Sequence, residues 1–143
     1  MNCEYQTIIA IDLLNNKINR YANKQLKPYN IKFNELNIIR YINEMNENNI
    51  EIYEKNLCQK FHIVHSTMVG IVFRLEFSGF ILVGDSNFDK RHTRIRITDK
   101  GKKLLKDTDV IYQEVIVKLR SILSIEEMEK YSLMIDKIEE IFK

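Results

Sequence analysis

The sequence predicts a mostly α-helical fold with one small β-hairpin, and three observations lead to this expectation. The 143 residues contain one Pro and four Gly; because these types interrupt regular structure, long helices are favoured over a many-stranded fold. Apolar residues recur at helical spacing along most of the chain, and only residues 80–97 hold two runs typical of strands. A hydrophobic content of 45% suffices for the core of one domain.

The N-terminal part of the chain predicts two amphipathic helices. Residues 4–26 carry a long apolar stripe, made by Ile8, Ile11, Leu14, Ile18 and Tyr21. Pro28 closes this helix because a proline cannot continue it. A second helix is expected over residues 35–44, with apolar positions at Leu36, Ile39, Tyr41 and Ile42. The polar residues 45–50 are expected to form a loop.

A pair of short helices is expected next, over residues 53–61 and 66–78. In the first, Leu57, Cys58 and Phe61 should face inward. In the second, Ser66 is a suitable N-cap and Gly79 a suitable end. The buried face of the second helix follows the spacing i, i+3, i+4 and i+7, given by Met68, Ile71, Val72 and Leu75.

The two strand-like runs come directly after these helices. Residues 80–83 begin one strand, and residues 94–97 alternate charged and apolar side chains, as a half-buried return strand does. We expect the runs to pair as a hairpin with a charged tip. Two helices followed by such a hairpin make a winged helix-turn-helix, which should occupy residues 32–101 of a single chain spanning 1–143.

Two further helices are expected after the hairpin. Thr98 can cap a helix that runs to about Leu123, with a stripe made by Leu104 or Leu105, Ile111, Val115, Leu119 and Ile122. Residues 124–127 (Ser-Ile-Glu-Glu) form a capping-box pattern that starts the last helix. Its apolar residues are spaced like a heptad seam, namely Met128, Tyr131, Ile135, Ile138 and Phe142.

The terminal segments 1–28 and 102–143 therefore carry apolar stripes longer than one winged helix can cover. The simplest arrangement is a homodimer in which these helices cover each other across a two-fold axis. The expected interface residues are Ile8, Ile11, Leu14, Ile18, Met128, Tyr131, Ile135, Ile138 and Phe142. A monomer with all three helices folded onto one core is the alternative.

The net charge is only +2, but its distribution is uneven. Residues 85–103 hold seven Lys or Arg against three Asp, a net charge of +4, whereas residues 121–143 hold three Lys against six Asp or Glu, a net charge of −3. A basic hairpin and an acidic C-terminal end make a polarised molecule, which suits docking on phosphate groups.

Several other classes of protein are disfavoured. There is no metalloprotease, phosphate-loop or nucleophile-elbow motif, so we expect neither an enzyme nor a cofactor. Cys3 and Cys58 lie far apart, and the spacing of His62, His65 and His92 fits no metal site, so reduced thiols and no metal are expected. The sequence has no membrane span and no signal-like start, which predicts a cytoplasmic protein.

Five short motifs together resemble the MarR-type regulators. These are Ser66-Thr67, Arg74-Leu75-Glu76, Gly79, Asp89-Lys90-Arg91 and Thr98-Asp99-Lys100-Gly101, which follow the family order RSTVTRLVDRLE, RGLV, DRR and LTxxG without a gap. The resemblance implies a homodimeric winged-helix transcription regulator, a repressor that binds a pseudo-palindromic site on double-stranded DNA. It also implies a small aromatic effector, bound between the dimer helices and the DNA-binding lobe.

The expected DNA contacts lie on two elements. The face of the second short helix opposite its buried residues would enter a major groove, and an Arg at the hairpin tip, held by Asp89, would enter the minor groove. The contacts are His65, Ser66, Thr67, Val69, Gly70, Phe73, Arg74, Asp89, Lys90, Arg91 and Arg94. Phe77 extends the same helix face. Arg74 has a structural alternative, a bond to the wing or to an Asp.

Several positions depart from the family pattern, and three of them, on the DNA-facing helix, leave two functions open. Val69, Gly70 and Phe73 stand where members often have Thr, Arg and Asp, and His62 stands where they usually have Gly, as a turn residue that tolerates left-handed geometry. The apolar side chains would contact thymine methyl groups in an A·T-rich operator, or they would bind protein and make the chain a winged-helix adaptor. A peroxide-sensing role for Cys3 is a further variant that the resemblance suggests.

Overall fold

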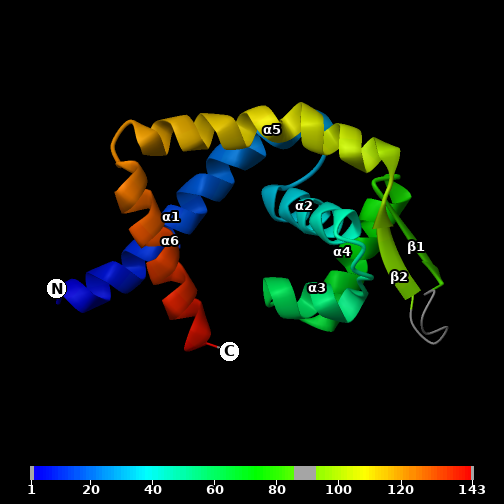
Figure 1. The fold of residues 1–143 in the computed structure, drawn as a ribbon, viewed down its shortest axis with the longest axis horizontal. Helices are drawn as coiled ribbons and strands as arrows, with labels where there is room; N and C mark the ends of the chain where they lie inside the picture. The colour runs from blue at the N-terminus through cyan, green and yellow to red at the C-terminus, as the bar shows by residue number, and fades with distance from the viewer. Residues whose placement is uncertain (1, 86–92, 143) are drawn as a thin grey trace. The chain divides into compact units, whose positions relative to one another are not determined.

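We describe a computed structural model of the chain, covering residues 2–85 and 93–142. Its elements, in order, are α1 (Cys3–Leu26), the 3-10 helix η1 (Lys27–Tyr29), α2 (Phe33–Glu47), α3 (Glu54–Phe61), α4 (His65–Phe77), β1 (Ile81–Asp85), β2 (Thr93–Ile97), α5 (Asp99–Arg120) and α6 (Ile125–Glu140) (Figure 1). The strands pair antiparallel as a two-stranded hairpin. The predicted fold class is confirmed, a mostly helical winged helix-turn-helix with long terminal helices.

The chain divides into two compact units, residues 1–108 and 109–143, and the boundary falls within α5. The first unit holds all of the buried core residues except Ile111, and α2 is its central helix. The core residues of this unit include Leu26 from α1, Leu36, Ile38, Ile39 and Ile42 from α2, Leu57 from α3, Met68 and Leu75 from α4, Ile81 and Ile95 from the hairpin, and Leu104 and Leu105 from α5. Each such side chain stabilises the fold by about 1.5–3 kcal/mol through its removal from water.

α2 is longer than the sequence analysis predicted, because residues 45–47 of the expected loop are helical. Two contacts explain the extension. The Asn43 amide donates to Glu47 Oε1 (3.1 Å) one turn later, and Asn46 is held by the backbone of β2. The helix ends where Asn49 takes a left-handed backbone (φ 55°), a conformation that asparagine tolerates better than most residues.

The hairpin is joined to the helices along the outer edge of β2. Ile95 N–H donates to Ile52 O (2.8 Å), and Ile97 N–H donates to Asn46 Oδ1 (2.8 Å). The Asn46 amide in turn points to Ile95 O at 3.4 Å. The segment before α3 therefore pairs with β2 at one isolated bridge, Tyr53 with Arg94, which no pattern in the sequence predicts.

The Thr98–Gly101 motif fixes the start of α5 against the end of α4. Thr98 Oγ1 accepts a hydrogen bond from Gly101 N–H (3.0 Å), as an N-cap does, and donates to Gly79 O (2.5 Å). Gly79 has φ 82°, where a side chain would be strained. A Cβ at Gly101 would lie 2.3 Å from Phe80 O, so this glycine permits a close approach of backbone to backbone.

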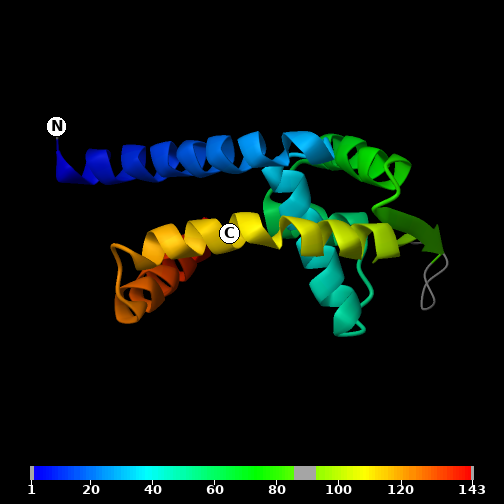
Figure 2. The same ribbon diagram turned by 90° about the horizontal axis from the view of Figure 1, so that it is seen from above.

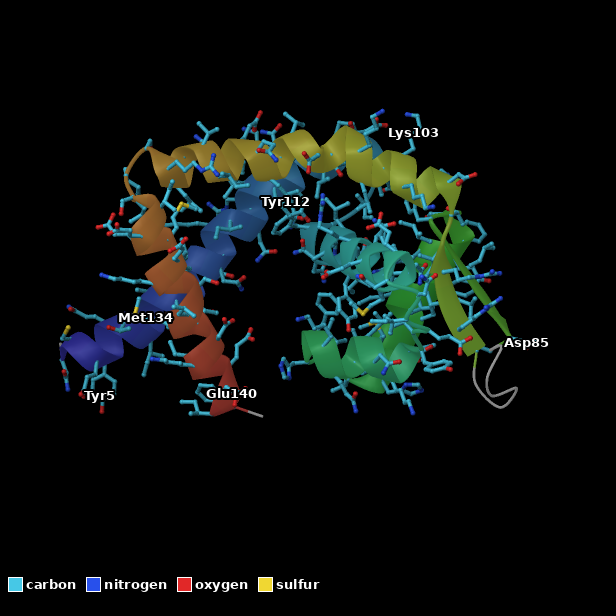
Figure 3. The ribbon with its side chains drawn as sticks, viewed as in Figure 1. Tyr5, Asp85, Lys103, Tyr112, Met134 and Glu140 are labelled. Atoms are coloured by element: carbon cyan, nitrogen blue, oxygen red, sulfur yellow. The ribbon has the colours of Figure 1, made fainter. Side chains whose placement is uncertain are left out.

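In the second unit, α6 begins with the predicted capping box, which is confirmed. Glu127 N–H donates to Ser124 Oγ (3.1 Å), and Ser124 N–H donates to Glu127 Oε2 (2.7 Å). Exposed apolar residues lie along α6 and directly after it, namely Tyr131, Leu133, Met134 and Ile138 within the helix and Ile141 and Phe142 beyond its end. Met134 is labelled in Figure 3. Nothing within the described part of this unit covers them.

In the first unit, the N-terminal half of α1 extends away from α2, α3 and α4, as Figures 1 and 2 show. Its apolar residues are exposed as a result, namely Tyr5, Ile8, Ile9, Ile11, Leu13 and Leu14. None of the helices in the described ranges is both long and apolar enough to span a lipid bilayer.

Candidate nucleic-acid interface

The turn between α3 and α4 contains His62 as a left-handed residue. His62 has φ 53°, and its N–H donates to Cys58 O as the C-cap of α3. The predicted left-handed turn geometry at His62 is confirmed. This turn sets the direction in which α4 leaves the core.

α4 buries one face and exposes the other, as its spacing predicted. Met68, Ile71, Val72 and Leu75 are buried. The residues expected on the opposite face are all exposed, namely His65, Ser66, Thr67, Val69, Gly70, Phe73, Arg74 and Phe77. The exposed fraction rises along the apolar part, from 44% at Val69 to 69% at Phe73 and 85% at Phe77.

The prediction that Ser66 caps α4 is wrong. The helix begins at His65, and Val64 takes the N-cap position with no side-chain hydrogen bond. The hydroxyl of Ser66 is therefore not used for capping, and within the described residues neither Ser66 nor Thr67 has a side-chain hydrogen bond to another residue. Both hydroxyl groups are available to an external partner.

His65 lies at the first position of α4 beside an acidic residue of α3. Its Nδ1 is 3.1 Å from Glu54 Oε1, a distance that makes an ion pair when the imidazole is protonated. The imidazole remains largely exposed. It can therefore face a phosphate at the N-terminus of α4, where the helix dipole is positive.

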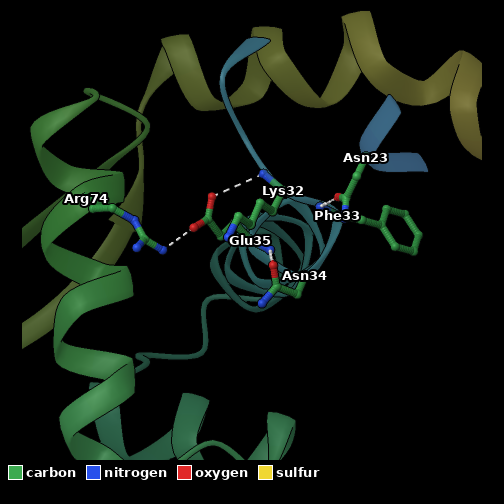
Figure 4. A network of polar contacts seen from close by, with 6 residues as sticks. All are labelled: Asn23, Lys32, Phe33, Asn34, Glu35 and Arg74. Atoms are coloured by element: carbon green, nitrogen blue, oxygen red, sulfur yellow. Dashed lines mark hydrogen bonds and ion pairs between the residues drawn. The ribbon is translucent and has the colours of Figure 1, made fainter. Parts of the chain in front are cut away.

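Arg74 connects α4 to the N-terminus of α2 (Figure 4). Its guanidinium forms an ion pair with Glu35 Oε1, while Glu35 Oε2 accepts a hydrogen bond from Lys32 N–H (3.2 Å). Glu35 is buried, so its two partners satisfy a carboxylate that would otherwise be costly to bury. The structural alternative for Arg74 is the one that these contacts support, although the carboxylate comes from a Glu of α2.

The hairpin side of the interface is described only at its base. Arg94 is a half-buried residue with 18% of its side chain exposed, and its Nη1 lies 3.9 Å from Glu51 Oε1. Glu51 Oε2 accepts a hydrogen bond from the Tyr53 hydroxyl (2.6 Å). Arg94 thus faces the segment before α3, and its contact with DNA stays a prediction. Asp89, Lys90 and Arg91 lie outside the described residues.

Three residues that position the interface were missed by the sequence analysis. Glu35 anchors Arg74, Asn46 holds β2, and Lys100 donates to Ser78 O (2.7 Å) at the C-terminus of α4 while lying 5.1 Å from the Phe80 ring centroid. Lys100 could have been found from the sequence, because it lies inside the Thr98–Gly101 motif. Glu35 could also have been found from the sequence, because it follows Lys32 at the spacing of a capping box.

Metal-binding residue types and cysteine thiols also occur among the described residues. These residues contain no group of three or more His, Cys, Asp or Glu that could hold a metal ion. Cys3 is exposed and Cys58 is half-buried, and both are free thiols.

Known transcriptional regulators are similar to this chain in part of their sequence or in their fold. No family model matches the sequence. The HTH-type transcriptional regulator Hpr of Bacillus thuringiensis (strain Al Hakam) is 33% identical over 81 residues, which is 56% of this chain and 41% of that protein. The match thus spans less than half the length of Hpr. An Hpr protein of Bacillus anthracis gives the same values.

Solved structures are similar over nearly the whole chain. The Staphylococcus aureus MepR–DNA complex has a TM-score of 0.86 at 18% identity and covers 99% of this chain and 100% of MepR. A mutant of Escherichia coli MarR complexed with operator DNA has a TM-score of 0.78 at 18% identity, covering 96% and 99%. The regulator RdhR-CbdbA1625 with bound 2,4-dichlorophenol has a TM-score of 0.79 at 19% identity, covering 98% and 81%. The chain has the fold of the MarR-type regulators, as its motifs predicted.

Proposed function

We propose that the chain is a homodimeric transcription repressor that binds double-stranded DNA through α4 and the hairpin. The observation that carries the proposal is the outward face of α4, which presents two unused hydroxyl groups, a histidine and an apolar stripe beside a basic hairpin. MepR and MarR, whose folds are similar, were solved with DNA. The chain would act by binding, without catalysis.

Dimerisation is the second part of the proposal. Of the expected interface residues, Ile8, Ile11, Leu14, Tyr131, Ile138 and Phe142 are exposed, and Ile18, Met128 and Ile135 are half-buried. Large apolar side chains gathered along two helices are unfavourable in water and mark an interaction surface. A second copy of the chain supplies the same stripes and can cover them across a two-fold axis.

A hollow in the first unit supports a small-molecule effector. It has a volume of about 690 Å³ and lies between the end of α1, the start of α2 and α4. Its wall includes the aromatic residues Phe73, Phe77 and Phe80 and the cations Lys27, Lys32 and Arg74. Aromatic rings and cations together suit an aromatic anion, such as a phenolate or an aromatic carboxylate.

Effector and DNA would then compete through shared residues. Phe73 and Arg74 belong both to this hollow and to the outward face of α4. A ligand that contacts them would change the surface offered to DNA. The resulting loss of DNA affinity would be set by how much more tightly the ligand binds the DNA-free protein than the DNA-bound protein. The bound 2,4-dichlorophenol of RdhR-CbdbA1625 is a small phenol of the kind proposed.

The adaptor remains the second candidate because Phe73 and Phe77 are unusually exposed. Their rings stack at 6.3 Å with an interplanar angle of 19°. An exposed aromatic pair rimmed by polar groups is typical of protein contacts. This function requires no DNA affinity.

A DNA-binding titration tests the proposed function against the adaptor. Arg91 is the residue to change, because the resemblance assigns it to the hairpin tip. In Arg91→Ala, we expect weaker DNA binding, with the slope of log affinity against log salt concentration reduced by about one unit if Arg91 meets a phosphate. If it enters a narrow minor groove, the loss should be greatest on A·T-tract duplexes.

Lys130→Ala is the matched control, since it removes the same charge from a residue of α6 that is not part of the proposed DNA-binding lobe, residues 32–101. Its DNA affinity and salt slope should stay close to those of the wild type. Unchanged affinity in Arg91→Ala on every duplex would remove the hairpin from the interface. The absence of salt-sensitive binding to any duplex would favour the adaptor.

A further inference from the structure

Gly70 lies inside α4 at a position where nothing in the described chain requires a glycine. A Cβ built there meets no neighbouring atom within 4 Å, in contrast to Gly101, where a Cβ would collide with backbone. A glycine within a helix disfavours folding by about fivefold relative to alanine. No contact within the described chain offsets this loss of stability in α4. We therefore look for a role of Gly70 in binding an external partner.

The missing side chain of Gly70 leaves open space on the helix surface between the side chains around it, and we call this space the notch. Ser66 and Thr67 lie one turn before it, and Phe73 lies one turn after it, because residues three and four apart are adjacent on a helix. Val69 is the residue directly before Gly70. All of them are exposed, and the Phe73 ring is held by its stack on Phe77. The notch thus has exposed apolar side chains and two exposed hydroxyl groups around it.

We infer that α4 recognises thymine through its C5-methyl group, which enters the notch at Gly70 against Phe73 and Val69. This inference rests on the proposed function and specifies the bases that the helix reads. In the major groove, the thymine methyl is the one apolar group that distinguishes a base pair. The absence of a side chain at Gly70 lets the helix backbone approach that group closely.

Two observations select DNA, rather than a protein segment, as the occupant of the notch. The face continues toward the N-terminus of α4 with Ser66 and Thr67, whose hydroxyl groups can meet phosphates or base edges. The adjoining segment 85–103 carries a net charge of +4, which complements DNA. Arg74 is already bound to Glu35, so hydrogen-bond readout of guanine by this part of the helix is disfavoured.

Replacing thymine with deoxyuridine tests the inference, because deoxyuridine lacks the methyl group and keeps its base pairing. The probe is a duplex of about 30 base pairs, selected for binding from a random-sequence pool. It is synthesised once with thymidine and once with deoxyuridine at the same positions. We expect about fourfold weaker binding for each contacted methyl group that is lost, the factor that corresponds to burying one such group. Equal affinity for both duplexes would overturn this inference and leave the proposed DNA-binding function intact.

Two protein variants show whether the methyl effect comes from the notch. Phe73→Ala should bring the thymine-to-deoxyuridine affinity ratio close to one, and Phe73→Leu should keep most of it. Gly70→Ala fills the notch, so it should lower the affinity for the thymine duplex and reduce the ratio, while the protein itself becomes more stable to urea. Weaker binding by a more stable protein separates recognition from misfolding.

The remaining outcomes also decide the matter. The same ratio in the wild type, Phe73→Ala and Gly70→Ala would assign the effect to altered DNA flexibility and overturn the inference, with DNA binding left intact. No salt-sensitive binding to any duplex would overturn the proposed function as well, and the face at Phe73 would then belong to a protein contact.

Discussion

Gly101 is a single residue on which the junction between α4, the hairpin and α5 depends. In Gly101→Ala, the new Cβ would lie 2.3 Å from Phe80 O and 2.7 Å from Ile97 Cγ1, so the backbone must shift. We expect the free energy of unfolding to fall by about 1–3 kcal/mol, measured by urea denaturation. Gly84→Ala is the control, since a Cβ at Gly84 meets nothing within 4 Å. Equal stability of the two variants would contradict this account of the junction.

Arg74 and Glu35 test whether a residue of the reading helix serves the fold. Arg74→Ala leaves the Glu35 carboxylate buried without its cation, so we expect a loss of about 1–3 kcal/mol in the free energy of unfolding. Glu35→Gln removes the charge and keeps the shape. In that background, Arg74→Ala should cost clearly less, as a double-mutant cycle would measure. Additive losses would mean that the pair contributes nothing.

At the scale of the element, the hairpin is held in place by α2 through Asn46. Asn46→Ala removes the acceptor for Ile97 N–H and should lower the free energy of unfolding by about 1–2 kcal/mol. The amide hydrogen of Ile97 should also exchange faster with solvent, and DNA affinity should fall because the hairpin is less well positioned. Asn48→Ala is the matched control, since Asn48 is exposed and bonds only within its own turn through Glu44 O. Unchanged Ile97 exchange in Asn46→Ala would contradict the role of Asn46.

Local periodicity explains which elements could be predicted from the sequence. The buried face of α4 and the capping box of α6 each depend on residues a few positions apart, and each strand of the hairpin has a local pattern of its own; all agree with the structure. The Arg74–Glu35 pair and the bond from Asn46 to β2 join residues 39 and 51 positions apart, so no local pattern announces them. The start of α4 at His65 was missed because Ser66 has the stronger capping propensity.

At the scale of the whole molecule, the terminal helices should decide the oligomeric state. Deletion of residues 124–143 removes the apolar residues of α6, so we expect the truncated chain to become monomeric or to aggregate. Its DNA affinity should fall as well, since two half-sites about one helical turn apart are held together only by a dimer. Analytical ultracentrifugation measures the first effect. A soluble, intact dimer after this deletion would exclude α6 from the interface.

The closed outer edge of β2 also limits how copies of the chain could polymerise. A two-stranded sheet offers two edges whose unpaired N–H and C=O groups can recruit further strands, and a fibril grows by using both. Here the N–H groups of Ile95 and Ile97 are already bonded to Ile52 O and Asn46 Oδ1. Strand addition along this part of the hairpin is therefore restricted to the β1 side. Two copies can pair there once, and open-ended growth through the hairpin is blocked as long as Asn46 and Ile52 stay in place.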